Sequence, residues 1–310
     1  MTGDVLPPGA RVDIAEVGAD RAEDVLALIQ ESFADRPVLD PPATAMEEDA
    51  ASVAAALAAN GGLLATHDGV PVGTLLFADD GPLLGLRRVG VIAAARGHGI
   101  AGLLAYRAAL VAQARGKVGL RLEARAELPS TVRFWQQNGY VEINRDGPRL
   151  HLLRLLPVST VLPTPEDTQE AGRRLAALLA AEDLLILTGD LGAGKTTFTQ
   201  GLADGLGVRG PITSPTFVIA RVHPSLVGGP ALVHVDAYRL GDSAELDDLD
   251  LDTDLDTAVT VVEWGSGLAE ALSSDRLELV LERAADDVRT LRVTPVGARW
   301  LGVDVAAVLK

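Results

Sequence analysis

Apolar and polar positions in the first half of the chain follow two periods and predict a mixture of strands and helices. Apolar residues at helical spacing predict helices, and short apolar runs bounded by turn residues predict strands. In chain order the pattern predicts a strand over 11–17, a helix over 21–33, an alanine-rich helix over 45–60, a hairpin over 62–77, a strand over 86–91, a helix over 100–116, a strand over 118–124, a short helix over 132–138, and two strands over 140–146 and 149–155. This order predicts an α+β fold with a mixed, mostly antiparallel sheet.

The pattern changes after residue 155. The segment 156–166 contains three prolines and no strong period, which places a domain boundary there. Beyond it, the pattern predicts a helix over 167–181, a continuously apolar strand over 184–188, and later strands over 231–236, 259–264, 277–282 and 289–295. Buried apolar strands that alternate with helices are typical of a mostly parallel α/β sheet. We therefore expect two domains, 1–156 and 157–310.

Composition and charge narrow the functional classes. The chain has 310 residues and a net charge of -16, of which -4 lies before Pro157 and -12 lies after it. Neither half has the basic balance of a free-standing nucleic-acid binder. The absence of cysteine excludes disulfide bonds, thiolate zinc sites and cysteine nucleophiles. The chain also lacks a basic-then-apolar leader and any apolar run of about 18 residues, so we expect a cytoplasmic protein without a membrane span.

A glycine-framed motif stands between the strand predicted over 184–188 and a following helix. Gly189, Gly194, Lys195 and Thr196 match the pattern G-x-x-x-x-G-K-[ST]. The glycines let backbone N–H groups surround phosphate oxygens, and the helix N-terminus adds a positive potential. In such a loop the lysine reaches the β and γ phosphates and the hydroxyl ligates Mg²⁺. The motif predicts binding of a nucleoside triphosphate.

The scarcity of lysine indicates which nucleotide binds. A guanine-reading N-K-x-D motif needs a lysine, but Lys117 and Lys310 stand in other contexts and Lys195 belongs to the phosphate loop. The sequence therefore favours ATP.

Two carboxylates follow apolar strands of the second half. Asp236 ends the strand over 231–236, and Glu263 lies at the end of the next strand. Ligands bind at the carboxyl ends of parallel strands, so these acids are candidates to hold a metal or orient water. Between the phosphate loop and Asp236, the run "TSPTF" over 213–217 either senses the γ phosphate or forms a simple proline turn.

The runs "GDLGAGKTT", "SPTF", "HVDAYRL" and "VEWG", in this order, resemble the TsaE (YjeE) family of P-loop ATPases over about 159–300. The resemblance implies an ATPase that assists the threonylcarbamoyl modification of the adenosine beside the anticodon of certain transfer RNAs. It would act through partner subunits, TsaB and TsaD, and the acidic balance agrees with contact to protein rather than to RNA.

The same resemblance implies roles for individual residues. Thr196 and Glu263 would hold Mg²⁺, Asp236 would serve hydrolysis, and 214–217 would form a switch. The residues implied to contact the nucleotide are Gly189, Asp190, Leu191, Gly192, Ala193, Gly194, Lys195, Thr196, Thr197 and Trp264.

The acidic run over 241–256 invites comparison with a calcium loop. Counted from Asp248 or Asp250, it lacks the glycine at the sixth position and the glutamate at the twelfth. We interpret it as a solvated acidic segment that could dock a partner.

The first half carries a second glycine motif at a strand-to-helix junction. Arg96, Gly99 and Ala101 match the pattern R-x-x-G-x-[GA], in which successive N–H groups at a helix N-terminus bind a pyrophosphate. Together with the element order and the run "RFWQQNGYVE", the motif resembles the GNAT acetyltransferase family over about 10–155. The implied ligand is acetyl-coenzyme A. The implied contacts are Val91, Ile92, Arg96, Gly97, His98, Gly99, Ile100 and Ala101.

Acetyl transfer to an amine needs a base and an acid. Glu123 matches the glutamate that serves as base in ribosomal-protein acetylases of this family, although a surface strand residue is an equal alternative. Those relatives use a tyrosine as acid where this chain has Trp135, and an indole cannot protonate a thiolate. Tyr140 or water would have to substitute, or the domain is inactive. The acceptor amine is unknown.

Three hypotheses follow. The first is a fusion of a transfer-RNA threonylcarbamoylation ATPase with an acetyltransferase. The second is a P-loop small-molecule kinase, for which Arg209, Arg221 and Arg239 are the arginines near the motif in sequence, none in a lid-like insertion. The third makes the first half a noncatalytic module for docking or for binding the coenzyme.

Overall fold

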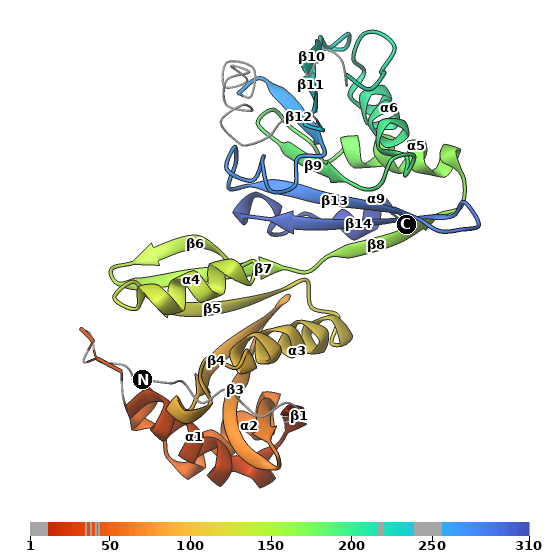
Figure 1. The fold of residues 1–310 in the computed structure, drawn as a ribbon. Helices are drawn as coiled ribbons and strands as arrows, with labels where there is room; N and C mark the ends of the chain where they lie inside the picture. The colour runs from red at the N-terminus through yellow and green to blue at the C-terminus, as the bar shows by residue number, and fades with distance from the viewer. Residues whose placement is uncertain are drawn as a thin grey trace. The chain divides into compact units, whose positions relative to one another are not determined.

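The computed structural model describes residues 12–34, 36–37, 39–40, 42, 44–215, 220–238 and 256–309. The chain divides into two compact units, Met1–Leu156 and Pro157–Lys310, each built on a seven-stranded sheet (Figure 1). None of the helices in these ranges combines the length and the apolar character needed to cross a membrane.

The first unit is a mostly antiparallel sheet with strand order β1-β2-β3-β4-β5-β7-β6, in which only β4 and β5 pair in parallel. Its strands are β1 (Val12–Val17), β2 (Gly62–His67), β3 (Val70–Asp80), β4 (Leu83–Val91), β5 (Gly119–Arg125), β6 (Val141–Asp146) and β7 (Arg149–Leu155). Its α-helices are α1 (Ala22–Ala34), α2 (Ala50–Asn60), α3 (Ile100–Ala114) and α4 (Pro129–Gln137). The predicted α+β fold is confirmed.

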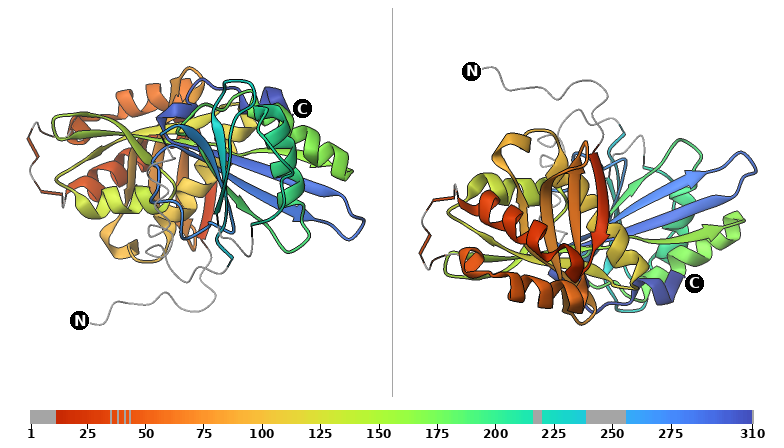
Figure 2. Two further views of the ribbon diagram at one scale, coloured as in Figure 1. Left: turned by 90° about the horizontal axis from the view of Figure 1, so that it is seen from above. Right: turned by 90° about the horizontal axis from the view of Figure 1, so that it is seen from below.

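Alternation along the strands supplies two cores, one on each face of this sheet. Leu75 packs with residues of α3 and α4, whereas its neighbour Leu76 packs with residues of α1 and α2. Successive side chains of a strand point to opposite faces, so one strand serves both layers. Figure 2 shows α1 and α2 covering one face of the strands.

The helix predicted over 45–60 was wrong at its start. A short 3₁₀ turn, Thr44–Glu47, precedes α2, which begins only at Ala50. Asp49 caps the helix: its carboxylate accepts a hydrogen bond from the Ser52 amide at 2.7 Å, and the Ser52 hydroxyl accepts one from the Asp49 amide at 3.0 Å. These two hydrogen bonds satisfy the amides of Asp49 and Ser52, which have no partner within the helix. The capping box therefore sets the start of α2 at Ala50.

The second unit is an α/β fold whose four central strands run in parallel in the order β11-β12-β9-β13. Three further strands pair antiparallel, with β10 at one side and β14 and β8 at the other. The strands are β8 (Val158–Leu162), β9 (Leu184–Thr188), β10 (Ala220–His223), β11 (Ala231–Asp236), β12 (Ala258–Glu263), β13 (Arg276–Arg283) and β14 (Arg289–Val296). The helices among the described residues of this unit are α5 (Pro165–Ala176), α6 (Lys195–Leu206) and the short α9 (Val305–Leu309). The predicted α/β class is confirmed.

The proline-containing segment at the boundary is more ordered than its sequence indicates. Val158–Leu162 forms β8 and pairs with β14, from Val158 opposite Val293 to Leu162 opposite Arg289. The prolines flank this strand rather than interrupt it, which is compatible with an edge position. The helix after it begins at Pro165, earlier than predicted, because Thr164 and Asp167 form a capping box there.

Close packing of α5 against α6 holds the two helices in backbone contact. A Cβ on Gly201 would lie 1.7 Å from the Gln169 carbonyl oxygen, and one on Gly172 would lie 2.2 Å from the Phe198 carbonyl oxygen. These glycines let α5 and α6 lie side by side at backbone contact (Figure 1). The arrangement holds the N-terminus of α6 in place, where the phosphate-loop motif ends.

Candidate functional site

The loop between β9 and α6 has the backbone conformation that its glycines permit. Gly189, Gly192 and Gly194 have φ values of 151°, 81° and 109°, which side chains rarely adopt. A Cβ on Gly189 would also lie 2.3 Å from the Leu281 carbonyl oxygen on β13. Thr196 and Thr197 lie in the first turn of α6. The loop therefore presents backbone N–H groups around the start of a helix, as an anion site requires.

Lys195 closes over this loop. Its Nζ donates to the carbonyl oxygens of Gly189 at 2.7 Å and Asp190 at 3.1 Å, and it lies 3.9 Å from the ring centroid of Trp264. Only 5 % of the residue is exposed, and burial lowers the pKa of its ammonium group while Glu263, Asp236 and Asp190 oppose that shift. Hydrogen bonds from an ammonium group to charged phosphate oxygens are stronger than those to neutral carbonyl oxygens. We therefore expect Lys195 to exchange these carbonyl oxygens for phosphate oxygens when a phosphate binds.

Sheet register brings the two predicted carboxylates together. Asp236 and Glu263 are partners in the parallel pairing of β11 with β12, and both are buried. The Thr196 hydroxyl donates to Glu263 Oε1 at 3.2 Å, which joins the end of β12 to the first turn of α6. Asp236 accepts hydrogen bonds from the Ser214 hydroxyl at 2.8 Å and from the Tyr238 amide at 3.0 Å.

Trp264 occupies a strained backbone position beside the loop. Its φ of 62° is uncommon for a residue other than glycine, and strain of this kind concentrates at functional sites. Its ring packs edge-on against Tyr238 with centroids 5.2 Å apart and lies under the Lys195 ammonium group. The loop residues Leu191, 90 % exposed, and Ala193, buried, flank Gly192.

One residue of this site escaped the sequence analysis. His234 is fully buried on β11, and its Nε2 lies 2.9 Å from Glu263 Oε1, so the ring donates a hydrogen bond to that carboxylate. Its position two residues before Asp236 places both side chains on one face of the strand. The alternation of side chains along the strand could therefore have indicated that His234 lies on the same face as Asp236.

Two arginines of the β13–β14 hairpin were also missed. A Cβ on Gly194 would lie 3.6 Å from Arg289 Nε, and one on Gly192 would lie 3.5 Å from a terminal nitrogen of Arg283. Both arginines are tied to the hairpin turn: Arg289 donates to the Asp287 carbonyl at 2.7 Å, and Arg283 Nε donates to the Asp287 carboxylate at 2.8 Å. They follow the phosphate loop by many residues in sequence, so spacing alone does not indicate them.

The chemistry of the side chains fits a magnesium ion. Across the part of the chain that the structure describes, no group of three or more His, Asp or Glu side chains converges as a complete metal cage. Mg²⁺ is usually held by one or two carboxylates or hydroxyls plus phosphate oxygens and water, and rarely by an all-protein cage. The Thr196 hydroxyl and the buried Glu263 carboxylate provide such a partial set.

Several predicted features fall on residues that the structure does not describe. Thr216 and Phe217 of the expected switch and Arg239 lie outside the described ranges, as does nearly all of the acidic run over 241–256.

In the first unit, the second glycine motif lies between β4 and α3, as predicted. Val91 ends β4, Ile92 follows it, and Gly97 and Gly99 have φ values of 83° and 75°. Ile100 and Ala101 begin α3, so their N–H groups lie in its first turn. The Arg96 side chain donates to the carbonyls of Val91 and Ser32, and His98 Nδ1 lies 3.3 Å from the Ala95 carbonyl. Arg96 therefore braces the loop, while the backbone presents the donors.

The strands β4 and β5 separate beside this loop. They pair only from Leu83 opposite Gly119 to Leu86 opposite Leu122, although both strands continue beyond. A register shift in the pairing of β3 with β4 and a φ of 52° at Arg88 mark a bulge where β4 leaves its neighbour. The separation opens the sheet at its middle.

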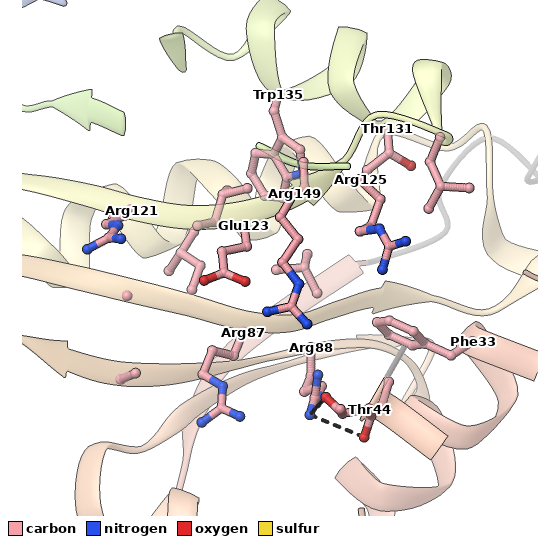
Figure 3. A pocket seen from close by; sticks show the side chains of 18 of the residues that line it. Phe33, Thr44, Arg87, Arg88, Arg121, Glu123, Arg125, Thr131, Trp135 and Arg149 are labelled. Atoms are coloured by element: carbon pink, nitrogen blue, oxygen red, sulfur yellow. Dashed lines mark hydrogen bonds between the residues drawn. The ribbon is translucent and has the colours of Figure 1, made fainter. Parts of the chain in front are cut away.

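A pocket of about 610 Å³ lies at this opening, and Glu123 and Trp135 both line it (Figure 3). The side chain of Glu123 is 57 % exposed, and its carboxylate lies 3.8 Å from His151 Nδ1. Trp135 is buried against Phe134 and Tyr140.

Tyr140 is poorly suited to replace the missing acid. Its ring is 1 % exposed, it does not line the pocket, and its hydroxyl has no hydrogen-bond partner among the described residues. Burial raises the pKa of that hydroxyl above its usual value, which makes proton donation to a thiolate less favourable.

Each half of the chain matches a protein-family model. Residues 162–291 match the family described as threonylcarbamoyl adenosine biosynthesis protein TsaE, and residues 23–140 match the acetyltransferase (GNAT) family. The second match agrees with the α+β fold and glycine motif of the first unit.

Curated relatives cover the second half. The tRNA threonylcarbamoyladenosine biosynthesis protein TsaE of Streptomyces coelicolor is 62% identical over 143 residues, which cover 44% of this chain and 97% of that protein. The protein of the same name from Bacillus subtilis is 43% identical over 137 residues, which cover 44% of this chain and 84% of that protein.

Solved structures resemble one half each. The crystal structure of Bacillus subtilis YdiB is 35% identical, covers 50% of this chain and 94% of its own, and has a TM-score of 0.41. PaiA N-acetyltransferase from Thermoplasma acidophilum, solved in complex with coenzyme A, is 14% identical, covers 47% of this chain and 99% of its own, and has a TM-score of 0.43.

High identity over nearly the full length of curated relatives, together with the phosphate loop and its carboxylates, identifies the second half. The chain belongs to the TsaE family, and it carries in front a unit that matches the GNAT acetyltransferases.

Proposed function

We propose that the second unit binds and hydrolyses ATP with Mg²⁺ and thereby supports the threonylcarbamoyladenosine modification of transfer RNA. The observation that carries this proposal is the convergence of Lys195, Thr196, Asp236 and Glu263 beside a glycine loop at the carboxyl ends of parallel strands. The curated relatives, which are tRNA threonylcarbamoyladenosine biosynthesis proteins, support this role.

Each side chain then has a distinct task. The N–H groups of 189–197 and the Lys195 ammonium group bind the phosphates, and Thr196 and Glu263 hold Mg²⁺, which neutralises charge on the β and γ phosphates when bound. Asp236, already an acceptor for Ser214 and Tyr238, orients the attacking water. Trp264 lies against the nucleotide once Lys195 turns toward the phosphates.

The ATPase acts on TsaB-like and TsaD-like subunits, and it reaches transfer RNA through that complex. The net charge of -16 supports this, because a direct grip on the RNA backbone needs clustered basic residues. The cytoplasm, where transfer RNA is modified, is the proposed location.

The first unit, we propose, is an acetyl-coenzyme A-dependent N-acetyltransferase with Glu123 as its base. The N–H groups of the loop over 96–101 bind the coenzyme, and the separation of β4 and β5 admits the acetyl end. With Trp135 at the usual acid position and Tyr140 buried, the departing thiolate takes its proton from water.

ATP hydrolysis by the full chain tests the proposal for the second unit. We expect weak basal hydrolysis, strong stimulation by TsaB-like and TsaD-like proteins of the same organism, and loss of both in Lys195→Ala. Lys117→Ala, outside the phosphate loop, is the matched control and keeps wild-type rates. Hydrolysis at wild-type rates in Lys195→Ala refutes the proposal, and phosphate transfer that appears only with an added metabolite indicates a small-molecule kinase instead.

A further inference from the structure

The pocket beside Glu123 is positively charged, although the chain as a whole is acidic. Its charged lining comprises six arginines, Arg36, Arg87, Arg88, Arg121, Arg125 and Arg149, against the three carboxylates of Asp79, Asp80 and Glu123. Glu48 and Glu127, which pair with Arg88 and Arg125 next to the pocket, reduce this excess but do not remove it, so the arginines without such partners attract anions.

Four of these arginines are engaged by neighbouring groups of the fold. Arg88 pairs with Glu48 at 2.8 Å, Arg121 with Asp80 at 3.2 Å and Arg125 with Glu127 at 2.7 Å. Arg36 donates to the Val89 carbonyl and stacks on Phe33, and burial together with Arg96 lowers its pKa to about 10. The contacts of these four arginines within the fold account for their positions.

Arg87 and Arg149 are different. Neither has a hydrogen-bond or ion-pair partner among the described residues, although the charge of Arg87 helps to lower the pKa of Glu48, and both line the pocket (Figure 3). An arginine fork without a carboxylate partner at a concave site is suited to bind a planar or tetrahedral oxyanion in two-point fashion.

Sheet register places both arginines on the face that carries Glu123. Gly85 is the parallel partner of Arg121, so Arg87, two residues further along β4, shares the face of Arg121 and Glu123. On the other side, Arg149 of β7 is the partner of Arg125, two residues beyond Glu123. Figure 3 shows Glu123 and Arg149 on one side of the strand that crosses the view and Arg87 on the other side.

The two arginines are not part of the expected coenzyme site. No residue of 96–101, where the N–H groups would bind the pyrophosphate, lines this pocket. Arg87 and Arg149 are therefore available to a ligand other than the pyrophosphate of the coenzyme.

We propose that the acetyl acceptor is a primary amine that also carries an oxyanion, a carboxylate or a phosphate, bound by Arg87 and Arg149. This inference rests on the proposed acetyltransferase function. The neutral amine nitrogen attacks the thioester carbonyl carbon of acetyl-coenzyme A, so a C–N bond forms and the C–S bond breaks. Glu123 accepts the proton lost by the amine, and the coenzyme A thiolate takes a proton from water.

Acetyl transfer by the full-length chain can be followed through the released coenzyme A thiol, because the protein has no cysteine to react with a thiol reagent. The acceptors compared are glutamate, a C-terminally amidated dipeptide with N-terminal aspartate, phosphoethanolamine, the asparagine counterpart of that amidated dipeptide, and spermidine. We expect at least tenfold higher kcat/KM for an anionic acceptor than for its neutral counterpart or spermidine, and the ranking among the first three identifies the carboxylate or phosphate source.

Variants assign the preference to the two arginines. Arg87→Gln and Arg149→Gln are expected to raise the KM for the anionic acceptor about tenfold and to erase the preference over its neutral counterpart, with the KM for acetyl-coenzyme A unchanged. Arg145→Gln, which removes an exposed arginine paired with Glu142 outside the pocket, is the control and keeps wild-type values.

Binding separates failure of this inference from failure of the proposed function. Calorimetry with coenzyme A present measures the affinity for the same acceptors without turnover. Binding of anionic amines that is lost in Arg149→Gln, without any acetyl transfer, supports the site and refutes the acetyltransferase. Transfer that prefers neutral or cationic amines, or no Arg87- and Arg149-dependent binding of any anionic amine, overturns the inference.

Discussion

At the scale of single residues, the phosphate loop depends on one lysine in an unusual setting. Lys195 is held by two carbonyl oxygens and the Trp264 ring while burial lowers the pKa of its ammonium group below the usual 10.5. Phosphate oxygens favour the charged form, so nucleotide binding must raise that pKa.

This shift predicts proton uptake on nucleotide binding. In the pH range between the lowered pKa of the free protein and the higher pKa of the complex, binding takes up about one proton, and affinity falls as the pH rises through the lower value. Calorimetry of ATP binding in two buffers of different ionisation enthalpy measures the uptake. Lys195→Arg keeps its charge throughout this range, so equal uptake in that variant would refute the assignment.

A second prediction concerns His234, the buried donor to Glu263. His234→Phe leaves the buried carboxylate without this hydrogen bond, which we expect to lower the free energy of unfolding by about 1–3 kcal/mol. We also expect a higher Mg²⁺ concentration for half-maximal ATP hydrolysis, because Glu263 loses its fixed orientation.

Denaturant unfolding and a Mg²⁺ titration of ATP hydrolysis provide the two readouts. His234→Gln, which keeps an N–H donor, should recover part of both losses. A Phe variant with the wild-type Mg²⁺ requirement would show that His234 serves packing alone.

At the scale of elements, the β13–β14 hairpin brings Arg283 and Arg289 to the phosphate loop. Their distance along the chain from Lys195 is large, but β13 pairs directly with β9, the strand that ends at the loop. The hairpin thus supplies positive charge that no local motif encodes.

We expect Arg289→Ala and Arg283→Ala to weaken ATP binding about five- to tenfold, since each removes a charged donor that lies beside the phosphate loop. Arg292→Ala is the matched control on β14, because that arginine is exposed and pairs with Glu282 instead. Titration calorimetry at fixed Mg²⁺ measures the affinities. If all three variants bind ATP with equal affinity, the hairpin arginines do not contribute to the nucleotide site.

At the scale of the whole molecule, each of the two units has its own sheet and its own core, and each carries its own predicted ligand site. A ligand that binds only the folded form stabilises the unit to which it binds. The two sites can therefore be separated in the intact chain by their effects on unfolding.

Thermal unfolding is expected to show two transitions. A ligand at about 100 times its Kd adds about 2.7 kcal/mol to the stability of its own unit, so ATP with Mg²⁺ should raise one midpoint and acetyl-coenzyme A the other. Differential scanning calorimetry with each ligand alone measures both. One transition that either ligand raises equally would show that the units unfold as one.

The sequence by itself determined the local features of this protein. The class of both folds, the two glycine loops and the acids at the ends of β11 and β12 follow from short-range patterns: apolar periodicity, the spacing of glycines, and the last residues of apolar runs. These signals depend on neighbours within a few residues, so they can be seen before the chain is folded.

Only the tertiary structure decided which distant residues meet. The β8 strand forms because β14 offers it a partner, and the hydrogen bond from His234 to Glu263 depends on the register of β11 with β12. Arg87 and Arg149 line the same pocket because β4 separates from β5 while β7 stays paired with β5. Pairing between strands far apart in sequence sets these contacts, and no local pattern records that register.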